Sequence, residues 1–262
     1  MRYDAGALAY DQLTGRWSRL FASAALSAAD VRPGGRLLDL ATGTGEGAAA
    51  GVQLVGEDGM VAGADLSLPM LEVAREKYDS KRLFLIAADA GRLPFAAHTF
   101  DCAICLFGLM FFPKPALFLA ELRRVVSPGG RIALTVWDRA ERAPFAGLMV
   151  LALAKEYPSA SGEILKGFSL WDPAAIRSYL GAAGFREVVV DPITRSASFP
   201  SIEAYFEPYE QGGARLGQFF LQLDKEGRQR VRTTVRNALE EMTNDGGVVS
   251  MDIHAFIATG VA

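Results

Sequence analysis

Short apolar runs alternate with helix-like amphipathic segments from about residue 35 to the end of the chain. This alternation is typical of βαβ units, in which crossover helices join parallel strands. The runs predict seven strands, at residues 36–40, 60–64, 82–88, 100–107, 131–137, 186–190 and 251–258. Because most runs are apolar throughout, we expect helices on both faces of the sheet. The predicted fold class is α/β, a doubly wound, seven-stranded, mostly parallel sheet with an inserted lid.

Three helices between these strands have readable ends. Ser67, with Pro69 just inside, predicts the start of a helix over residues 68–78. A helix over residues 115–126 carries leucines and valines along one side and stops before the Ser-Pro-Gly-Gly turn at 127–130. Asp172 and Gly184 predict the start and the end of a helix over residues 174–183.

Two connections are longer than a normal crossover, residues 138–171 and 194–249. Insertions of this length in an α/β domain form lids or substrate walls, and additional packing or a dimer surface is an equal alternative here. The second connection contains several aromatic residues and a charged helix near residues 225–242. The predicted division is an N-terminal helical cover (1–34), a sheet domain (35–193) with a helical insert (139–171), a helical lid or substrate insert (194–249) and the final strand (250–262).

Composition narrows the classes of partner. The 262 residues carry 27 Lys and Arg against 30 Asp and Glu, a formal net charge of −3, so no positive field favours nucleic acid. The longest uncharged apolar helix candidate, residues 144–154, is shorter than the roughly 20 residues that a membrane span needs. The first residues lack the pattern of a signal peptide. Cys102 and Cys105 share one apolar run and are expected to be buried. We therefore expect a soluble, cytoplasmic protein.

The most informative segment runs from the first predicted strand into a glycine-rich turn, at residues 37–48. Gly43, Gly45 and Ala48 fit the spacing G-x-G-x-x-G/A. In a strand–turn–helix unit of this kind, the backbone of the turn approaches a bound nucleotide closely, and the N–H groups at the start of the helix face the ligand. The glycines alone do not distinguish one nucleotide cofactor from another.

Three aspartates narrow the choice of cofactor. Asp39, Asp65 and Asp89 follow or end the first three predicted strands at separations of 26 and 24 residues. They are expected along the carboxyl edge of the sheet, where open α/β sheets bind ligands. A carboxylate at Asp39 repels a pyrophosphate but attracts a cation. This favours S-adenosylmethionine (SAM), which carries an ammonium and a sulfonium, over NAD or FAD. Asp65, 20 residues after Gly45, suits the two ribose hydroxyls.

The chain resembles the class I SAM-dependent methyltransferases over roughly residues 10–137. The resemblance is to the small-molecule group that is similar to the ubiquinone/menaquinone biosynthesis methyltransferases. The motifs that carry it are residues 38–45, 93–95 with 100–101, 107–113, and 121–125 leading to 128–130. The resemblance implies a Rossmann-like fold, SAM as cofactor and S-adenosylhomocysteine (SAH) as product.

The resemblance also implies two groups of cofactor-binding residues. Those around the methionine part are Asp39, Ala41, Gly43, Gly45, Leu106 and Phe107. Those at the ribose and adenine are Asp65, Leu66, Met70, Asp89 and Ala90.

The expected reaction is in-line transfer of a methyl group to an O, N or C nucleophile of a small molecule, such as a quinone-like, phenolic or natural-product substrate. Because SAM carries its own electrophile, the protein mainly positions the nucleophile and excludes water. Candidates for contact with substrate are Tyr10, Trp17, Met110 and Phe111. Core packing is the alternative for Met110 and Phe111, and anchoring of the first helix is favoured for Trp17. No catalytic residue and no metal ligand is assigned, and a homodimer is compatible with the sequence.

Other functions stay open or are disfavoured. A SAM-binding protein that uses this fold for chemistry other than methyl transfer has the same cofactor half. A nicotinamide-dependent oxidoreductase is disfavoured by Asp39 and by the third strand-end acid, Asp89. Nucleic-acid amino methyltransferases carry an Asn/Asp-Pro-Pro-aromatic element where this chain has Leu-Phe-Gly-Leu at 106–109. A metal-dependent catechol-type enzyme needs clustered acids, of which Asp138 alone is present.

Overall fold

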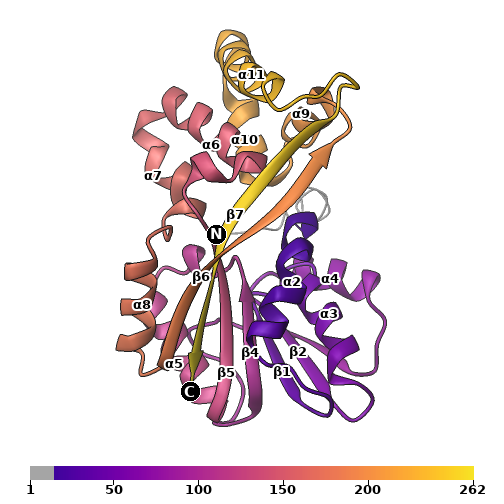
Figure 1. Cartoon of the computed structure of the whole chain (residues 1–262), viewed down its shortest axis with the longest axis vertical. Coiled ribbons are helices and arrows are strands. Elements are labelled where there is room, and N and C mark those ends of the chain that lie inside the picture. The colour runs from indigo at the N-terminus through magenta and orange to yellow at the C-terminus, as the bar shows by residue number, and fades with distance from the viewer. Residues whose placement is uncertain (1–14) are drawn as a thin grey trace.

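The computed structural model describes residues 15–262, which build one seven-stranded sheet (Figure 1). The strand order is β3-β2-β1-β4-β5-β7-β6. The strands are β1 (Arg36–Leu40), β2 (Met60–Asp65), β3 (Leu83–Ala87), β4 (Phe100–Leu106), β5 (Val126–Trp137), β6 (Arg186–Phe199) and β7 (Val249–Val261). Within residues 15–262, β7 runs antiparallel to β5 and β6, and the other pairs of neighbouring strands are parallel. The predicted seven-stranded, mostly parallel α/β fold is confirmed.

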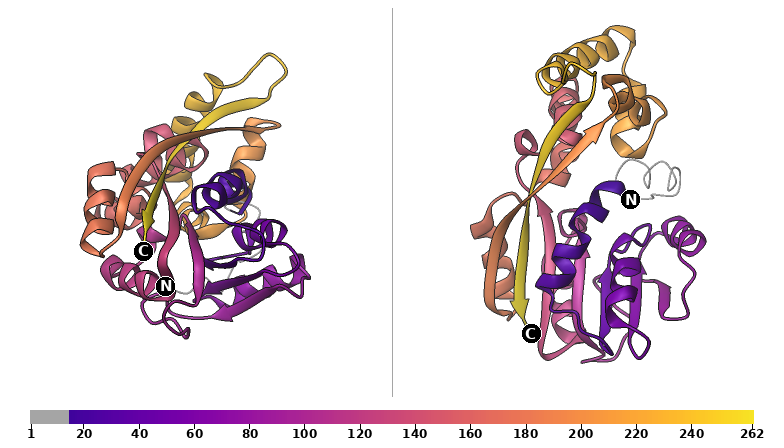
Figure 2. Two further views of the ribbon diagram at one scale, coloured as in Figure 1. Left: turned by 60° about the horizontal axis from the view of Figure 1, so that its bottom comes forward. Right: turned by 45° about the vertical axis from the view of Figure 1, so that its right-hand side comes forward.

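Helices cover both faces of the sheet (Figure 2). On one side α2 (Arg16–Ala28) packs against α3 (Glu46–Val55), and α4 (Leu68–Lys77) lies over the β2–β3 end. On the other side α5 (Pro115–Val125) packs against α8 (Pro173–Ala182). The three helices predicted from their end signals are confirmed to within one residue. The double cover explains the unbroken apolar runs, since central strands such as β1 have no water-facing side.

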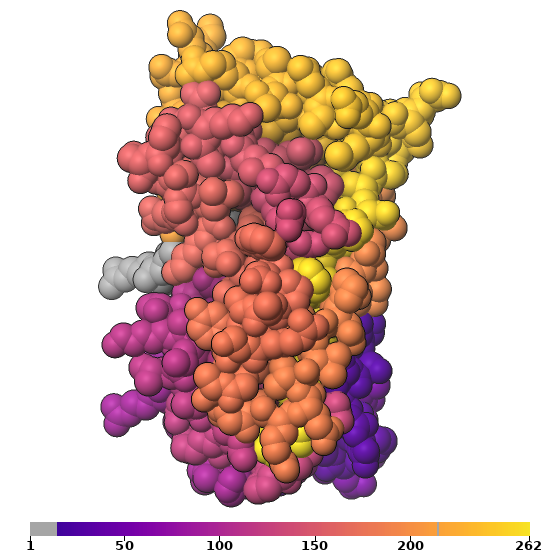
Figure 3. Space-filling model, turned by 60° about the vertical axis from the view of Figure 1, so that its left-hand side comes forward, coloured from indigo at the N-terminus to yellow at the C-terminus, as the bar shows by residue number. Residues whose placement is uncertain are grey.

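A group of helices, here the upper helices, stands above the carboxyl end of the sheet (Figure 1). The connection after β5 forms α6 (Pro144–Glu156), α7 (Ser161–Ile164) and the short 3-10 turns η3 (Ala140–Arg142), η4 (Pro158–Ala160) and η5 (Leu165–Phe168). The connection after β6 forms α9 (Ile202–Glu210), α10 (Ala214–Gln222) and α11 (Lys225–Glu240). In the space-filling view the first connection lies between α11 above and α8 below (Figure 3). Both long connections are therefore mainly helical in the described chain.

Three strands are longer by more than one residue than the sequence patterns predicted. β6 was expected at 186–190 but continues to Phe199, β7 begins at Val249 and ends at Val261, and β5 begins at Val126. The added part of β6 pairs with β7 as far as Phe199 opposite Val249, so residues 194–199 lie in the sheet and not in a helical segment. This edge strand alternates exposed and half-buried positions and contains Pro192, which an edge tolerates. A search for continuous apolar runs misses such a strand.

Aromatic side chains tie the upper helices to the sheet domain. The Trp17 ring lies 5.0 Å from that of Phe145 on α6 and 5.5 Å from that of Phe199 on β6, measured between centroids. Tyr205 on α9 donates its hydroxyl to the carbonyl of Pro144 at 3.1 Å, and Tyr209 donates to that of Phe145 at 3.0 Å. Buried aromatic pairs contribute about 0.5–1.5 kcal/mol each beyond their area. These contacts fix α2, α6, β6 and α9 against one another.

Two further expectations concern the environment of the chain. Cys102 and Cys105 are buried and form no disulfide, as predicted for small apolar residues. Across residues 15–262, no helix has the length and apolar character that crossing a membrane requires.

Candidate functional site

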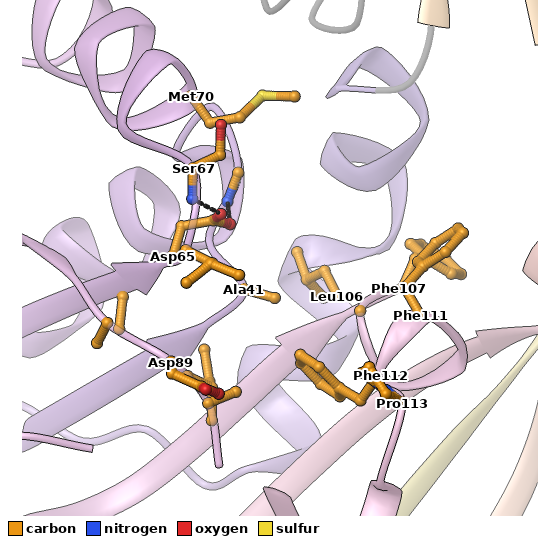
Figure 4. A pocket seen from close by; sticks show the side chains of 17 residues that line it. Ala41, Asp65, Ser67, Met70, Asp89, Leu106, Phe107, Phe111, Phe112 and Pro113 are labelled. Carbon is orange, nitrogen blue, oxygen red and sulfur yellow. Dashed lines mark hydrogen bonds between the residues drawn. The ribbon is translucent and has the colours of Figure 1, made fainter. Parts of the chain in front are cut away.

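A cavity of about 580 Å³ opens at the carboxyl ends of β1, β2 and β4 (Figure 4). This volume is within the range of small-molecule sites in proteins. The residues that line it are Leu40, Ala41, Gly43, Ala64, Asp65, Leu66, Ser67, Met70, Ala88, Asp89, Ala90, Leu106, Phe107, Gly108, Phe111, Phe112 and Pro113. Polar side chains occupy one side, at Asp65, Ser67 and Asp89, and phenylalanines occupy the other (Figure 4).

The glycine-rich turn between β1 and α3 forms one wall. Ala41, Gly43 and Gly45 have φ of +59°, +55° and +88°. Positive φ is ordinary for glycine but rare for alanine, so Ala41 carries a strained backbone of the kind found at functional sites. A Cβ at Gly45 would lie 3.0 Å from Ala74 Cβ and 3.1 Å from the Tyr78 ring. Glycine is therefore needed at Gly45 both for its backbone and for space.

Asp65, the last residue of β2, bridges two loops of the cavity. Its Oδ2 accepts a hydrogen bond from the Gly43 N–H at 2.8 Å and its Oδ1 accepts one from the Ser67 N–H at 2.9 Å. A carboxylate has about four acceptor positions, so Asp65 keeps acceptor capacity for a ligand. Burial raises the pKa of Asp65, although the backbone hydrogen bonds oppose that shift.

Ser67 adds a polar group that the sequence patterns did not single out as a ligand contact. It precedes α4, yet its side chain makes no capping hydrogen bond. Its Oγ is buried and has no hydrogen-bond partner among residues 15–262, although the residue lines the cavity. Buried hydroxyls are usually paired, so this oxygen is suited to a polar ligand.

Asp89 and Ala90 line the cavity from a tight turn after β3. Asp89 Oδ1 accepts from the Gly91 N–H at 2.8 Å, and its carbonyl accepts from the Arg92 N–H at 2.9 Å. These bonds fix the turn that presents Asp89 and Ala90. The spacing argument predicted that Asp65 and Asp89 reach the same edge of the sheet, and the structure brings both to one cavity.

Asp39 is placed differently from that expectation. It is 1% exposed and is absent from the cavity lining, as is Gly45. Its Oδ2 accepts from Thr42 Oγ1 at 2.7 Å, while Oδ1 has no partner within the described residues. Burial raises the pKa of Asp39 to about 7. The carboxyl therefore lies beneath the glycine-rich turn, and any contact with a ligand in this geometry passes through that turn.

The opposite wall is built by the end of β4 and the short turn η2 (Leu109–Phe111). Phe107 has φ of +55°, a second strained position beside the cavity. Its ring stacks on Trp137 with centroids 3.4 Å apart and planes at 7°. Phe112 stacks in turn on Phe118 of α5, at 4.4 Å. Stacking from behind makes this wall rigid and apolar.

The residues predicted to contact substrate differ in their position relative to the cavity. Phe111 lines the cavity. Met110 and Trp17 are buried and lie outside the lining, with Trp17 in the aromatic contacts to α6 and β6. Tyr10 lies outside the described residues. Within the described chain, no cluster of His, Cys, Asp and Glu has a metal-binding arrangement.

Some residues that line the cavity were not predicted as site residues, although their positions in the sequence motifs could have indicated them. Phe112 and Pro113 stand in the motif 107–113 that supports the resemblance, and Gly108 follows the predicted Phe107. A Cβ at Gly108 would lie 2.7 Å from Ala41 Cβ and 2.8 Å from Cys105 Sγ. The ends of β1 and β4 approach so closely here that only glycine fits.

The sequence is similar to known methyltransferases. A sequence profile described as a methyltransferase domain matches residues 38–134. A ubiquinone/menaquinone biosynthesis C-methyltransferase of Teredinibacter turnerae is 37% identical over 142 residues, 53% of this chain and 56% of that protein. A demethylmenaquinone methyltransferase of Beutenbergia cavernae is 35% identical over 199 residues, 71% of this chain and 79% of that protein.

The chain spans about half the length of several of the curated relatives it matches. The solved structure of a phosphoethanolamine N-methyltransferase of Haemonchus contortus, in complex with SAM, has a TM-score of 0.60 and covers 98% of this chain and 57% of its own. At 18% identity, that likeness concerns the fold alone.

Proposed function

We propose a reaction for this protein from one premise, that the chain belongs to the SAM-dependent methyltransferases, in the group related to the ubiquinone/menaquinone enzymes. The proposed reaction is transfer of the methyl group of SAM to a small molecule, with SAH as the second product. The observation that carries the proposal is the cavity itself, which has carboxylates at Asp65 and Asp89 on one side and an aromatic wall on the other.

The residues of the cavity fit SAM in chemistry as well as in place. In the proposal the Asp65 carboxylate also accepts from the ribose hydroxyls, and Leu66 and Met70 lie against the adenine. Leu66 is 69% exposed, so an apolar base that covers it gains from burial. Asp89 and Ala90 meet the adenine edge. The buried Ser67 Oγ, unpartnered within residues 15–262, supplies a further polar contact.

The methionine part is assigned to the other end of the cavity. Ala41 and Gly43 from the glycine-rich turn, and Leu106 and Phe107 from β4, would border it. The Asp39 carboxyl beneath the turn adds negative charge whenever it is ionised, which favours a cationic ligand. We propose that Asp39 and Gly45 do not contact the methionine part directly but hold the glycine-rich turn that borders it.

SAM supplies an electrophilic methyl on a sulfonium, whose positive charge is lost as the methyl group is transferred. The protein therefore needs no charged group beside the leaving sulfur. Phe107, Phe111 and Phe112 give an apolar wall that excludes water from the reacting atoms. Positioning of the acceptor in line with the methyl is the main remaining task of the chain.

For the acceptor we propose a small molecule with an O, N or C nucleophile, of quinone-like, phenolic or natural-product type. The similarity to C-methyltransferases of ubiquinone and menaquinone biosynthesis supports this class. The upper helices, which stand above the carboxyl edge where the cavity opens, would form the substrate wall (Figure 2).

The test is release of SAH and transfer of labelled methyl from SAM in the presence of a panel of quinols, phenols and amines. Methyl transfer to at least one class, with SAH released in equal amount, supports the proposal. Tight SAM binding without methyl transfer to any member would instead support the alternative, a SAM-binding protein with other chemistry.

A further inference from the structure

The turn that presents Asp89 and Ala90 continues into a loop that α5 holds with side-chain hydrogen bonds. Glu121 Oε2 accepts from the backbone N–H of Leu93 at 2.7 Å. Arg124 donates to the Phe95 carbonyl at 2.6 Å and to the Leu93 carbonyl at 3.1 Å. Both backbone groups of Leu93 are thus bound by side chains one helical turn apart.

Glu121 and Arg124 also hold each other. Arg124 donates to both carboxylate oxygens of Glu121, at 2.6 and 2.7 Å, in a bidentate pair. Such a pair fixes both side chains in geometry as well as in charge. The side chains are 19% and 36% exposed, so water only partly competes. Leu93 itself is 5% exposed, and its N–H has little access to another partner.

The first turn of α5 also lies close to the same turn. A Cβ placed on Gly91 would lie 3.7 Å from Leu117 Cβ and 3.4 Å from Asp89 Oδ1. The turn from Asp89 to Arg92 therefore has the first turn of α5 behind it and the bound Leu93 at its end. Its position relative to the cavity is set by α5, which contributes no residue to the cavity lining.

We propose that Glu121 and Arg124 are positioning residues, which hold the turn at Asp89 and Ala90 in place for the adenine end of the cofactor. The inference rests on the proposed function, since it concerns the affinity for SAM and SAH. It gives a role to two sequence motifs, residues 93–95 and 121–125, that contain no residue of the cavity.

The experiment compares Glu121→Ala with Glu156→Ala in the full chain. Glu156 on α6 accepts from Arg230 of α11 at 2.7 and 3.0 Å, so its removal also breaks a bidentate pair, within the upper helices. SAH affinity is measured by titration calorimetry. Amide hydrogen exchange of residues 89–95 is measured without ligand, because it reports the loop directly.

The expected result is faster exchange of residues 89–95 and an SAH Kd raised about tenfold in Glu121→Ala. Tenfold corresponds to about 1.4 kcal/mol, within the cost of leaving a buried amide without its partner. Glu156→Ala should change neither quantity. Arg124→Lys, which keeps the charge but loses the planar fork, should raise the Kd about threefold and serves if Glu121→Ala does not fold.

Faster exchange in Glu121→Ala with an unchanged SAH Kd would overturn the positioning role. So would an equal loss of affinity in Glu156→Ala, because that result reports general destabilisation. A wild-type chain that binds neither SAM nor SAH contradicts the proposed function itself, and the inference falls with it. The wild-type titration distinguishes these failures.

Discussion

The backbone N–H of Phe107 donates to two oxygens of Thr135, its carbonyl at 3.1 Å and its Oγ1 at 3.0 Å. Thr135 is fully buried on β5, two residues before the Trp137 ring on which Phe107 stacks. Phe107 has a positive φ, which costs a non-glycine residue about 1–3 kcal/mol. The neighbouring strand therefore holds a strained residue of the cavity wall in place from behind.

Thr135→Val should destabilise the chain and weaken SAH binding together. Valine matches the shape of threonine but removes Oγ1, while the carbonyl still accepts from Phe107. The expected loss is therefore about 0.5–1 kcal/mol of unfolding free energy, and the SAH Kd should rise about two- to fivefold. Denaturant unfolding and calorimetry measure the two effects. Thr135→Ser retains the hydroxyl and should leave the SAH Kd near the wild type, although the loss of a buried methyl group costs about 0.5–1.5 kcal/mol of unfolding free energy. An SAH Kd raised equally in both variants would remove the role of Oγ1.

Asp65→Ala should weaken SAM binding by about 1–3 kcal/mol, because in the proposed site the ribose hydroxyls lose their acceptor. Two backbone N–H groups, of Gly43 and Ser67, also lose their partner. Calorimetric titration with SAM gives the change in affinity directly.

Asp101→Ala is a matched control for that variant. Asp101 near the start of β4 accepts from the Arg36 backbone N–H at 2.9 Å and from its side chain, and it is not among the cavity lining residues. Its removal should leave the SAM Kd within about twofold of the wild type. An Asp65→Ala variant that binds SAM as tightly as Asp101→Ala would exclude the ribose role.

Gly108→Ala should destabilise the protein and narrow the cavity. The new methyl meets Ala41 Cβ at 2.7 Å and Cys105 Sγ at 2.8 Å, and such overpacking costs about 1–3 kcal/mol. Gly181→Ala on α8 is the control, because its added Cβ has no neighbour within 4 Å among residues 15–262 outside its own helix backbone. Alanine inside a helix should stabilise by about 0.5–1 kcal/mol. Thermal unfolding should therefore move in opposite directions for the two variants, and a fall in both would contradict the close approach described.

Asp39→Asn should change how stability depends on pH. The pKa of Asp39 is raised by burial to about 7, from an ordinary value near 3.8. Between pH 3.8 and about 7 the Asp39 carboxyl is ionised in the unfolded chain but still protonated in the folded chain. The unfolding free energy therefore falls as pH rises through this range. The limit is about 1.4 kcal/mol per pH unit. Asparagine removes the effect, so the stability of the variant relative to the wild type should improve by about 1–3 kcal/mol from pH 5 to pH 7. A constant difference in urea unfolding over that range would show that the carboxyl titrates elsewhere.

Much of the fold was predictable from the sequence, because strands and helix ends depend on patterns of neighbouring residues. Apolar runs between helix signals located all seven strands, and Asp172 accepts from the Ala174 N–H as its position before a helix predicted. The spacing of Asp65 and Asp89 placed both at the edge where the cavity lies. In each case one element, or the regular repeat of βα units, determines the outcome.

Features that depend on contacts between distant segments were not predictable in the same way. The spacing of Asp39 gives its strand but not its depth, which depends on how Thr42 and the glycine-rich turn cover it. The outer half of β6 is a strand because β7 pairs with it, although its sequence is polar at alternate positions. Glu121 accepts from the N–H of Leu93 and Arg124 donates to its carbonyl, and these hydrogen bonds join residues about 30 positions apart.

Titration calorimetry of the full chain decides whether the cavity between Asp65 and Phe107 binds SAM. SAM and SAH should each bind at one site per chain, Asp65→Ala should weaken both, and NADH should not bind. Binding of NADH without any binding of SAM or SAH would show that the cavity is not a SAM site.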